Sequence, residues 1–141
     1  MCAGSYKTSF RVTWVDTDAA GVVHYSNYFR FFERAEEEFY ASLGFTFTNL
    51  KESGLWFPRI EAFCRYKKPA HYDDVLEIVV SVEELREKVL RLGFIVTNKM
   101  SGDLLAEGHL VIVAADKQAG KSAKIPLEIS EKLRPFAKQI L

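Results

Sequence analysis

The chain has 141 residues, of which 48% are hydrophobic and 27% charged, a composition typical of a globular protein with one buried core. The charges of its 19 basic and 19 acidic side chains cancel, which argues against binding to nucleic acid or an anionic membrane through net charge. The first residues lack the apolar region of a signal peptide, and no apolar run is long enough to cross a bilayer. Cys2 and Cys64 form neither a disulfide framework nor a metal-ligand spacing. We therefore expect one cytoplasmic domain over residues 1–141, with no membrane insertion, no metal and no cofactor.

The first predicted element is a strand over residues 7–15. Its apolar residues Phe10, Val12 and Trp14 alternate with others, which is the period of a strand with one buried face. An acidic loop that contains a glycine, residues 16–21, ends this strand.

A long helix is predicted next, over residues 27–43. Apolar residues recur there every three or four positions, at Tyr28, Phe32, Ala35, Phe39 and Leu43. Further aromatic side chains widen this stripe, which indicates that other elements surround the helix. Ser26 or Asn27 can cap its start, and Gly44 suits the left-handed residue beyond its end. Several carboxylates predict a solvated helix face, at Glu33, Glu36, Glu37 and Glu38.

Strand-like runs dominate the remainder of the chain after a polar connection at residues 45–54. The runs cover residues 55–67, 75–85, 89–97 and 104–115, with turns at 86–88 and 98–103. Pro126 suits the first turn of a short helix that ends near Lys138. A strand, a long helix and an antiparallel meander of about four strands predict an α+β layer architecture. The uncovered face or edge of such a sheet predicts a homo-oligomer.

The step from the acidic loop to the long helix brings carboxylates close to free backbone donors. The start of a helix leaves N–H groups without partners and carries a partial positive charge. A carboxylate beside such donors can act on a carbonyl while the donors stabilise the resulting oxyanion. Asp18 is therefore a candidate nucleophile or base, whereas Asp16 is better explained by binding to backbone donors of its own loop.

The sequence of this stretch resembles the 4-hydroxybenzoyl-CoA thioesterase family. The resemblance rests on residues 16–28, DTDAAGVVHYSNY, on residues 32–35, FERA, and more weakly on residues 66–78. It is similar to the bacterial branch that includes the Tol–Pal-associated and the 1,4-dihydroxy-2-naphthoyl-CoA thioesterases. The resemblance implies a hotdog fold, in which a bent antiparallel sheet wraps around one long central helix. It also implies dimers that form edge to edge and pair again into tetramers.

The resemblance further implies roles for individual residues. Asp18 matches the catalytic carboxylate of the family, and the backbone N–H of Tyr25 matches the group that polarises the thioester carbonyl. Gly21 matches a glycine that lets the chain turn closely around the substrate. Part of the branch has the order Tyr-His where this sequence has His24-Tyr25, so the resemblance gives His24 no catalytic role.

Other residues are candidates for contact with the substrate, and each has a structural alternative. His24, Asn27 and Tyr28 lie near the predicted helix start, where a histidine can act as a structural hydrogen-bonding group, an asparagine as a cap and a tyrosine as helix support. Basic side chains could hold the phosphates of coenzyme A or serve solubility alone, and the candidates are Arg65, Lys67 and Lys68.

The sequence therefore predicts an acyl-CoA thioesterase that releases a free acid and coenzyme A. One alternative is a hotdog hydratase or dehydratase, which needs a His–Asp pair that His24, His71 and His109 do not suggest. A second alternative is a hotdog module that binds an acyl or aromatic ligand without catalysis. The sequence does not define the acyl group.

Overall fold

The structure of the protein is a computed structural model that describes residues 3–141, so Cys2 lies outside the described residues. The helices are α1 (Asn27–Ser42), α2 (Phe47–Glu52) and α3 (Leu127–Leu133). The longer strands are β1 (Tyr6–Arg11), β3 (Arg59–Tyr66), β4 (Val75–Leu85), β5 (Val89–Asn98) and β6 (Leu104–Val113). The shorter strands are β2 (Leu55–Trp56), β7 (Ala115–Asp116), β8 (Lys121–Ser122) and β9 (Ala137–Ile140).

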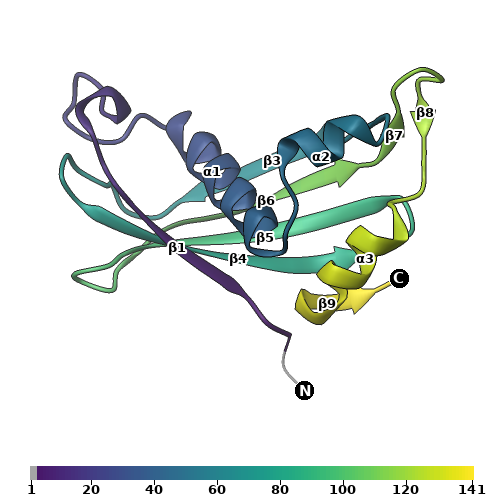
Figure 1. Ribbon diagram of the computed structural model, residues 1–141. Coiled ribbons are helices and arrows are strands. Elements are labelled where there is room, and N and C mark those ends of the chain that lie inside the picture. Colours follow the sequence, from purple (N-terminus) through teal and green to yellow (C-terminus); the bar gives the residue numbers. More distant parts are fainter. Residues whose placement is uncertain (1–2) are drawn as a thin grey trace.

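The main sheet has the order β1-β4-β5-β6-β3, with β9 also paired to β4, and β2-β7-β8 form a smaller sheet. Strands β4, β5 and β6 form the predicted antiparallel meander, joined by the predicted turns. The expected place of β3 within that meander is wrong, because β3 lies beyond β6 while β1 borders β4. Helix α1 packs on one face of the sheet (Figure 1), and strands β4, β5 and β6 separate the two outer strands.

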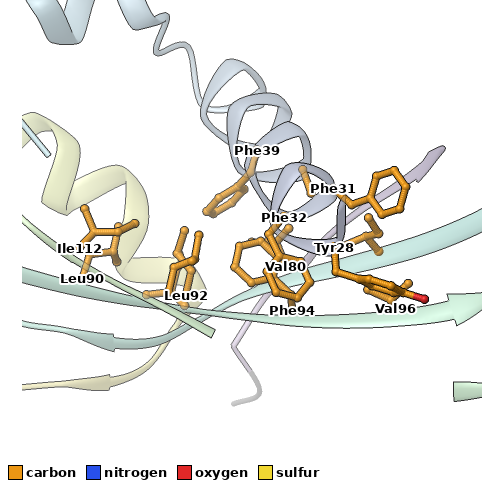
Figure 2. Close-up of a cluster of buried hydrophobic side chains, with 14 of the residues drawn as sticks. Tyr28, Phe31, Phe32, Phe39, Val80, Leu90, Leu92, Phe94, Val96 and Ile112 are labelled. Carbon is orange, nitrogen blue, oxygen red and sulfur yellow. The ribbon is translucent and has the colours of Figure 1, made fainter. Parts of the chain in front are cut away.

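The core forms between α1 and the face of the sheet beneath it. Phe31, Phe32 and Phe39 are at most 1% exposed, and their rings point from α1 toward the strands (Figure 2). The Phe32 ring stacks on Phe94 of β5 at 4.4 Å between centroids. Burying one such side chain contributes about 1.5–3 kcal/mol. The prediction of an α+β hotdog, with the sheet wrapped around one aromatic helix, is confirmed.

The first strand ends earlier than predicted, at Arg11 rather than at residue 15. The Asp16 carboxylate accepts hydrogen bonds from both the backbone N–H and the hydroxyl of Thr13, each at 2.9 Å. These bonds close a short 3-10 turn over Trp14–Asp16. Trp14, placed on the strand by its spacing, is therefore 78% exposed.

The predicted polar connection contains a helix that the sequence pattern did not indicate. Thr46 caps α2, since its hydroxyl accepts a hydrogen bond from the Asn49 N–H at 3.2 Å. The run predicted over residues 55–67 is divided into β2 and β3, because Pro58 lies between them and has no N–H for a ladder. The run predicted over residues 104–115 is likewise divided, into β6 and β7.

The C-terminal segment also differs from its prediction. Pro126 precedes α3 rather than opening it, and α3 ends at Leu133 instead of near Lys138. Pro135 cannot donate an α-helical hydrogen bond, and a 3-10 turn over Arg134–Phe136 follows α3. The chain then forms β9, which pairs in parallel with Val82–Leu85 of β4. The N-terminal β1 covers residues 75–80 of the same strand.

Candidate active site

Asp18 lies at the start of a tight hairpin that connects the 3-10 turn to α1. Its backbone N–H donates to the Val22 carbonyl at 2.9 Å, and its carbonyl accepts from the Gly21 N–H at 3.0 Å. The Asp18 side chain is half-buried, and its Oδ1 accepts one hydrogen bond, from the Ala20 N–H at 2.8 Å. The carboxylate is thus held by its own loop while keeping acceptor capacity for another group.

Gly21 gives this hairpin its turn. Its φ is +83°, a left-handed conformation that strains residues with a side chain. A Cβ added to Gly21 would have no neighbouring atom within 4 Å, so the chain leaves open space on this side of the loop.

Asp16 joins the hairpin to the beginning of α1. Its carbonyl accepts from the His24 N–H at 2.9 Å and from the Asn27 side-chain amide at 2.8 Å. Asn27 therefore anchors the loop and does not cap the helix. The Ser26 side chain makes no cap hydrogen bond either; instead the His24 Nδ1 lies 2.8 Å from the Ser26 Oγ and accepts from the Ser26 N–H at 3.2 Å. Ser26 thus occupies the predicted N-cap position without a side-chain cap bond, and Gly44 has the predicted left-handed φ, +88°.

Tyr25 presents a free backbone donor at the helix start. Within residues 3–141, no hydrogen bond uses the Tyr25 N–H, although the neighbouring N–H groups of His24, Ser26 and Asn27 are all bonded. The Tyr25 side chain is 66% exposed and stacks on the His24 ring.

Tyr66 of β3 fixes the position of this donor from the neighbouring strand. Its phenol donates to the Tyr25 carbonyl at 2.8 Å. Burial, with Cys64 and other neighbouring groups adding to it, raises the pKa of Tyr66 to about 12, so the phenol keeps its proton at neutral pH. No role for Tyr66 was predicted from the sequence.

The other candidate residues are one tyrosine in the core and three exposed basic residues at the end of β3. Tyr28 is only 3% exposed and packs edge-on against Phe31 and Tyr66 in the core. The basic candidates lie exposed at the end of β3 beside Tyr66. Lys67 lies 3.9 Å from Glu107 and Lys68 lies 3.4 Å from Asp103, while the Arg65 guanidinium lies 5.5 Å from the centre of the Phe63 ring.

Glu36 corrects the predicted solvated face of the long helix. Its side chain is 2% exposed and is the one buried charged group in the described part of the chain. Its Oε1 accepts from the Arg59 guanidinium at 2.5 Å, and its Oε2 accepts from the Tyr40 phenol at 2.6 Å. Burial raises the pKa of Glu36, against the opposing effect of Arg59 and Tyr40. A signal was present in the sequence, because Glu36 follows Phe32 by four residues and precedes Phe39 by three, on the apolar stripe.

These groups line a cavity of about 760 Å³ between the second half of α1, α2 and the sheet. Most of its wall is apolar, with Phe45, Trp56, Leu90 and Ile112 among the contributors. Its volume lies within the range of small-molecule sites.

Within residues 3–141, no helix combines the length and hydrophobicity needed to span a membrane.

Comparison with known proteins connects this arrangement to a family. A family model described as the thioesterase-like superfamily matches residues 12–133. The acyl-CoA thioester hydrolase YbgC of Escherichia coli O6:H1 is 30% identical over 124 residues, which are 88% of this chain and 92% of that protein.

Two solved structures extend this comparison. The structure of a hypothetical protein from Aquifex aeolicus has a TM-score of 0.85 and 37% identity, and the match covers 91% of this chain and 98% of that one. The structure of the gentisyl-coenzyme A thioesterase BH1999 has a TM-score of 0.79 and 33% identity, over 88% of this chain and 98% of that one. The chain therefore belongs to the thioesterase-like superfamily, and the prediction of a thioester hydrolase is confirmed at the level of that family.

Proposed function

We propose that this protein hydrolyses an acyl-CoA thioester to a free acid and coenzyme A, with Asp18 and the Tyr25 N–H as the reacting groups. One observation carries the proposal: the hairpin that bears the Asp18 carboxylate leads directly to a backbone donor left free at the start of α1. The acyl-CoA thioester hydrolases among its relatives support the reaction class.

The reaction follows from the chemistry of these two groups. The thioester carbonyl oxygen accepts a hydrogen bond from the Tyr25 N–H, and the partial positive charge of the helix start adds to the polarisation. The Asp18 carboxylate then acts in one of two ways. It attacks the carbonyl carbon, expels the coenzyme A thiolate and forms a mixed anhydride that water hydrolyses, or it takes a proton from a water molecule that attacks instead. Either course consumes one water and yields one acid and one thiol.

Neighbouring groups would position the substrate around this centre. The open space beside Gly21 suits close approach of the thioester, and His24 and Asn27 border the same loop. The basic groups proposed to hold a phosphate lie exposed at the end of β3. They are Arg65, Lys67 and Lys68, and the two lysines each have an acidic neighbour. Tyr28, being buried, would support the helix start from the core.

We also propose that two copies pair along β3. This strand ends the sheet order, and its side chains are unusually exposed for a strand, with Ile60 at 65% and Phe63 at 40%. Such an apolar edge is a template for another strand. A two-fold axis at Phe63 would bring Glu61 of each copy opposite Arg65 of the other, so charge complementarity supports an antiparallel pair. Assembly of dimers into tetramers stays a prediction.

Thiol release from short, long and aromatic acyl-CoAs tests the reaction. Wild-type protein should release thiol from at least one of them, and Asp18→Asn should lower kcat by at least about a hundredfold, because the amide is neither nucleophile nor base. Asp16→Asn is the matched control, since its side-chain oxygen can still accept from Thr13. It should retain activity within about tenfold of wild type.

Three outcomes would contradict the assignment. Near-normal hydrolysis by Asp18→Asn would remove Asp18 from the reaction. Consumption of enoyl-CoA without thiol release would favour the hydratase alternative. That alternative needs a histidine–carboxylate pair near the substrate, whereas the His109–Glu61 pair, 2.7 Å apart, lies on the sheet face that points away from α1. Saturable binding of acyl-CoA without turnover would favour a ligand-binding module.

A further inference from the structure

Tyr25 lies between two carbonyl groups that are both hydrogen-bonded. The peptide group that contains the Tyr25 N–H also contains the His24 carbonyl, which accepts from the Asn27 N–H at 2.9 Å. The next peptide group contains the Tyr25 carbonyl, which accepts from the Tyr66 phenol at 2.8 Å. Because each peptide group is planar, holding both carbonyls restricts the direction in which the Tyr25 N–H points.

The bond from Tyr66 connects this segment to the sheet. The bond from Asn27 lies within the loop, and the His24 N–H likewise donates to the Asp16 carbonyl of the same loop. Within residues 3–141, no other hydrogen bond joins residues 24–26 to the main sheet. The Tyr66 phenol therefore determines where this part of the loop lies relative to β3.

Tyr66 is itself held firmly in place. It is the last residue of β3, and the two residues after it both donate to the Leu105 carbonyl, Lys67 at 2.8 Å and Lys68 at 3.1 Å. Its ring packs edge-on against Tyr28 of α1, with 5.1 Å between the ring centroids. A side chain that is fixed by a strand and by a helix can hold a reacting group in one position.

Stability alone does not explain this contact. Tyr66 is 45% exposed, so water could replace its phenol as the donor to the Tyr25 carbonyl, and the net contribution of such a bond to stability is small. A phenol on a strand, however, keeps a fixed position that water does not. Fixed donors matter most where charge develops in a transition state, and a displacement of about 1 Å can lower a rate about a hundredfold.

We propose that Tyr66 is a positioning residue for thioester hydrolysis: through the Tyr25 carbonyl, it holds the Tyr25 N–H where the thioester oxygen gains charge in the transition state. This inference rests on the proposed function and deepens it, because it adds a residue of β3 to a centre formed by the loop and the start of α1. Tyr66 neither contacts the substrate nor transfers a proton. Its pKa, raised to about 12 by burial and neighbouring groups, keeps the phenol protonated as a donor at neutral pH.

Removing the hydroxyl group tests this role through kinetics. Tyr66→Phe keeps the ring that packs against Tyr28. Thiol release from hexanoyl-, palmitoyl- and benzoyl-CoA is measured, and for any thioester that wild type hydrolyses kcat should fall about tenfold to a hundredfold. KM should stay within about threefold of wild type, because an interaction that acts only in the transition state does not change substrate binding.

Tyr72→Phe is the matched control. Tyr72 is 50% exposed and packs against Trp14, outside the proposed centre. Loss of its hydroxyl group should leave kcat within about twofold of wild type, as expected for a surface position. Circular dichroism verifies that both variants are folded.

The pH dependence separates positioning from proton transfer. Because Tyr66 stays protonated, the ratio of kcat for wild type to kcat for Tyr66→Phe should be constant between about pH 6 and about pH 9. A ratio that changes over this range would mean that Tyr66 exchanges a proton during the reaction, and it would overturn the positioning role.

A nuclear magnetic resonance measurement tests the contact without turnover. The Ser26 amide shares a peptide group with the Tyr25 carbonyl, so its nitrogen chemical shift changes when that carbonyl loses a hydrogen bond. Tyr66→Phe should shift or broaden the amide signals of Tyr25 and Ser26, whereas Tyr72→Phe should leave them unchanged.

The possible failures are distinguishable. A wild-type kcat in Tyr66→Phe, a rise in KM alone, or unchanged amide signals of Tyr25 and Ser26 would overturn this inference and leave the thioesterase proposal intact. Absence of thiol release by wild type from every thioester would overturn the proposed function and this inference with it.

Discussion

Two strand glycines with different neighbours give a test of packing at the scale of single residues. A Cβ on Gly108 would lie 2.2 Å from the Phe63 carbonyl oxygen and 2.7 Å from the Phe32 ring. We expect Gly108→Ala to lower the free energy of unfolding by about 2–3 kcal/mol, because backbone and a core ring must both move.

Gly93→Ala is its matched control. The added Cβ would approach only the flexible end of Glu83, at 2.3 Å from Oε1. Losing the Glu83–Arg91 ion pair should cost no more than about 1 kcal/mol. Urea unfolding of both variants measures the difference, and equal destabilisation would contradict the assigned close contact.

Glu36 should make stability depend on pH. Burial raises its pKa above the ordinary value of 4.5, so the folded chain holds this proton more tightly than the unfolded chain does. The stability contributed by Glu36 is then complete below about pH 4.5 and is lost as the pH rises through the raised pKa.

A comparison with Glu36→Gln isolates this effect. As the pH rises from about 4 to about 8, the unfolding free energy of wild type should decrease relative to that of the variant. Urea unfolding at several pH values measures it, and Glu37→Gln, at an exposed neighbouring position, should follow wild type. A relative gain by wild type with rising pH would show that Arg59 outweighs burial.

The candidate site was predicted from a local pattern and from a resemblance. The acidic loop before a helix start made Asp18 a candidate, and the family resemblance added Gly21 and Tyr25; their catalytic roles stay predictions. The local pattern could not reveal that the Tyr66 phenol would reach the Tyr25 carbonyl, since those residues are 41 positions apart. The ion pair of Glu36 with Arg59 could not be predicted for the same reason, since these residues are 23 positions apart in the sequence.

Among the elements, those with strong periodicity were predicted and those stabilised by tertiary pairing were not. Helix α1 and strands β4, β5 and β6 have regular apolar spacing and appear close to their predicted limits. Strand β9 has the sequence AKQI, which lacks alternation, and it forms because β4 offers a free edge. Helix α2 is six residues long, too short to show a helical period.

Removing β9 tests its contribution as an element. A chain that ends before Ala137 loses the pairing with Val82–Leu85 and the bond from the Leu141 N–H to the Leu85 carbonyl at 2.8 Å. We expect a lower midpoint of thermal unfolding, with the core around α1 retained. An unchanged midpoint would mean that β9 contributes no stability; Lys138→Ala, at an exposed position of β9, is the control.

For the whole molecule, the proposed pairing predicts that two defective chains restore each other. Asp18→Asn lacks the reacting carboxylate, and Ala41→Trp fills the cavity from a lining position on α1. Each alone should be nearly inactive. Tyr66 holds the Tyr25 loop at one end of β3, and Arg59 lines the cavity at the other, so an antiparallel β3 pair brings the loop of one chain beside the cavity of the other. If a complete site is formed in this way, random mixing should recover about a quarter of wild-type activity, because half of the dimers are mixed and each has one of two sites complete.

Co-expression of differently tagged chains, followed by an assay of thiol release, measures this recovery. Mixing Ala41→Trp with a chain that carries both substitutions provides the control, because no complete site can form. Activity no greater than the sum of the separate variants would show that carboxylate and cavity belong to one chain.

The coverage of β4 by both ends of the described chain has a consequence for assembly. With β1 and β9 occupying that side, the eleven-residue β4 is covered, and the sheet ends there in strands of six and four residues. In the language of polymer chemistry, β9 is a blocking group on one end of the sheet. A chain without β9 would expose residues 82–85 of β4 as a coupling site in addition to β3, and repeated coupling through both sites would lead toward fibres.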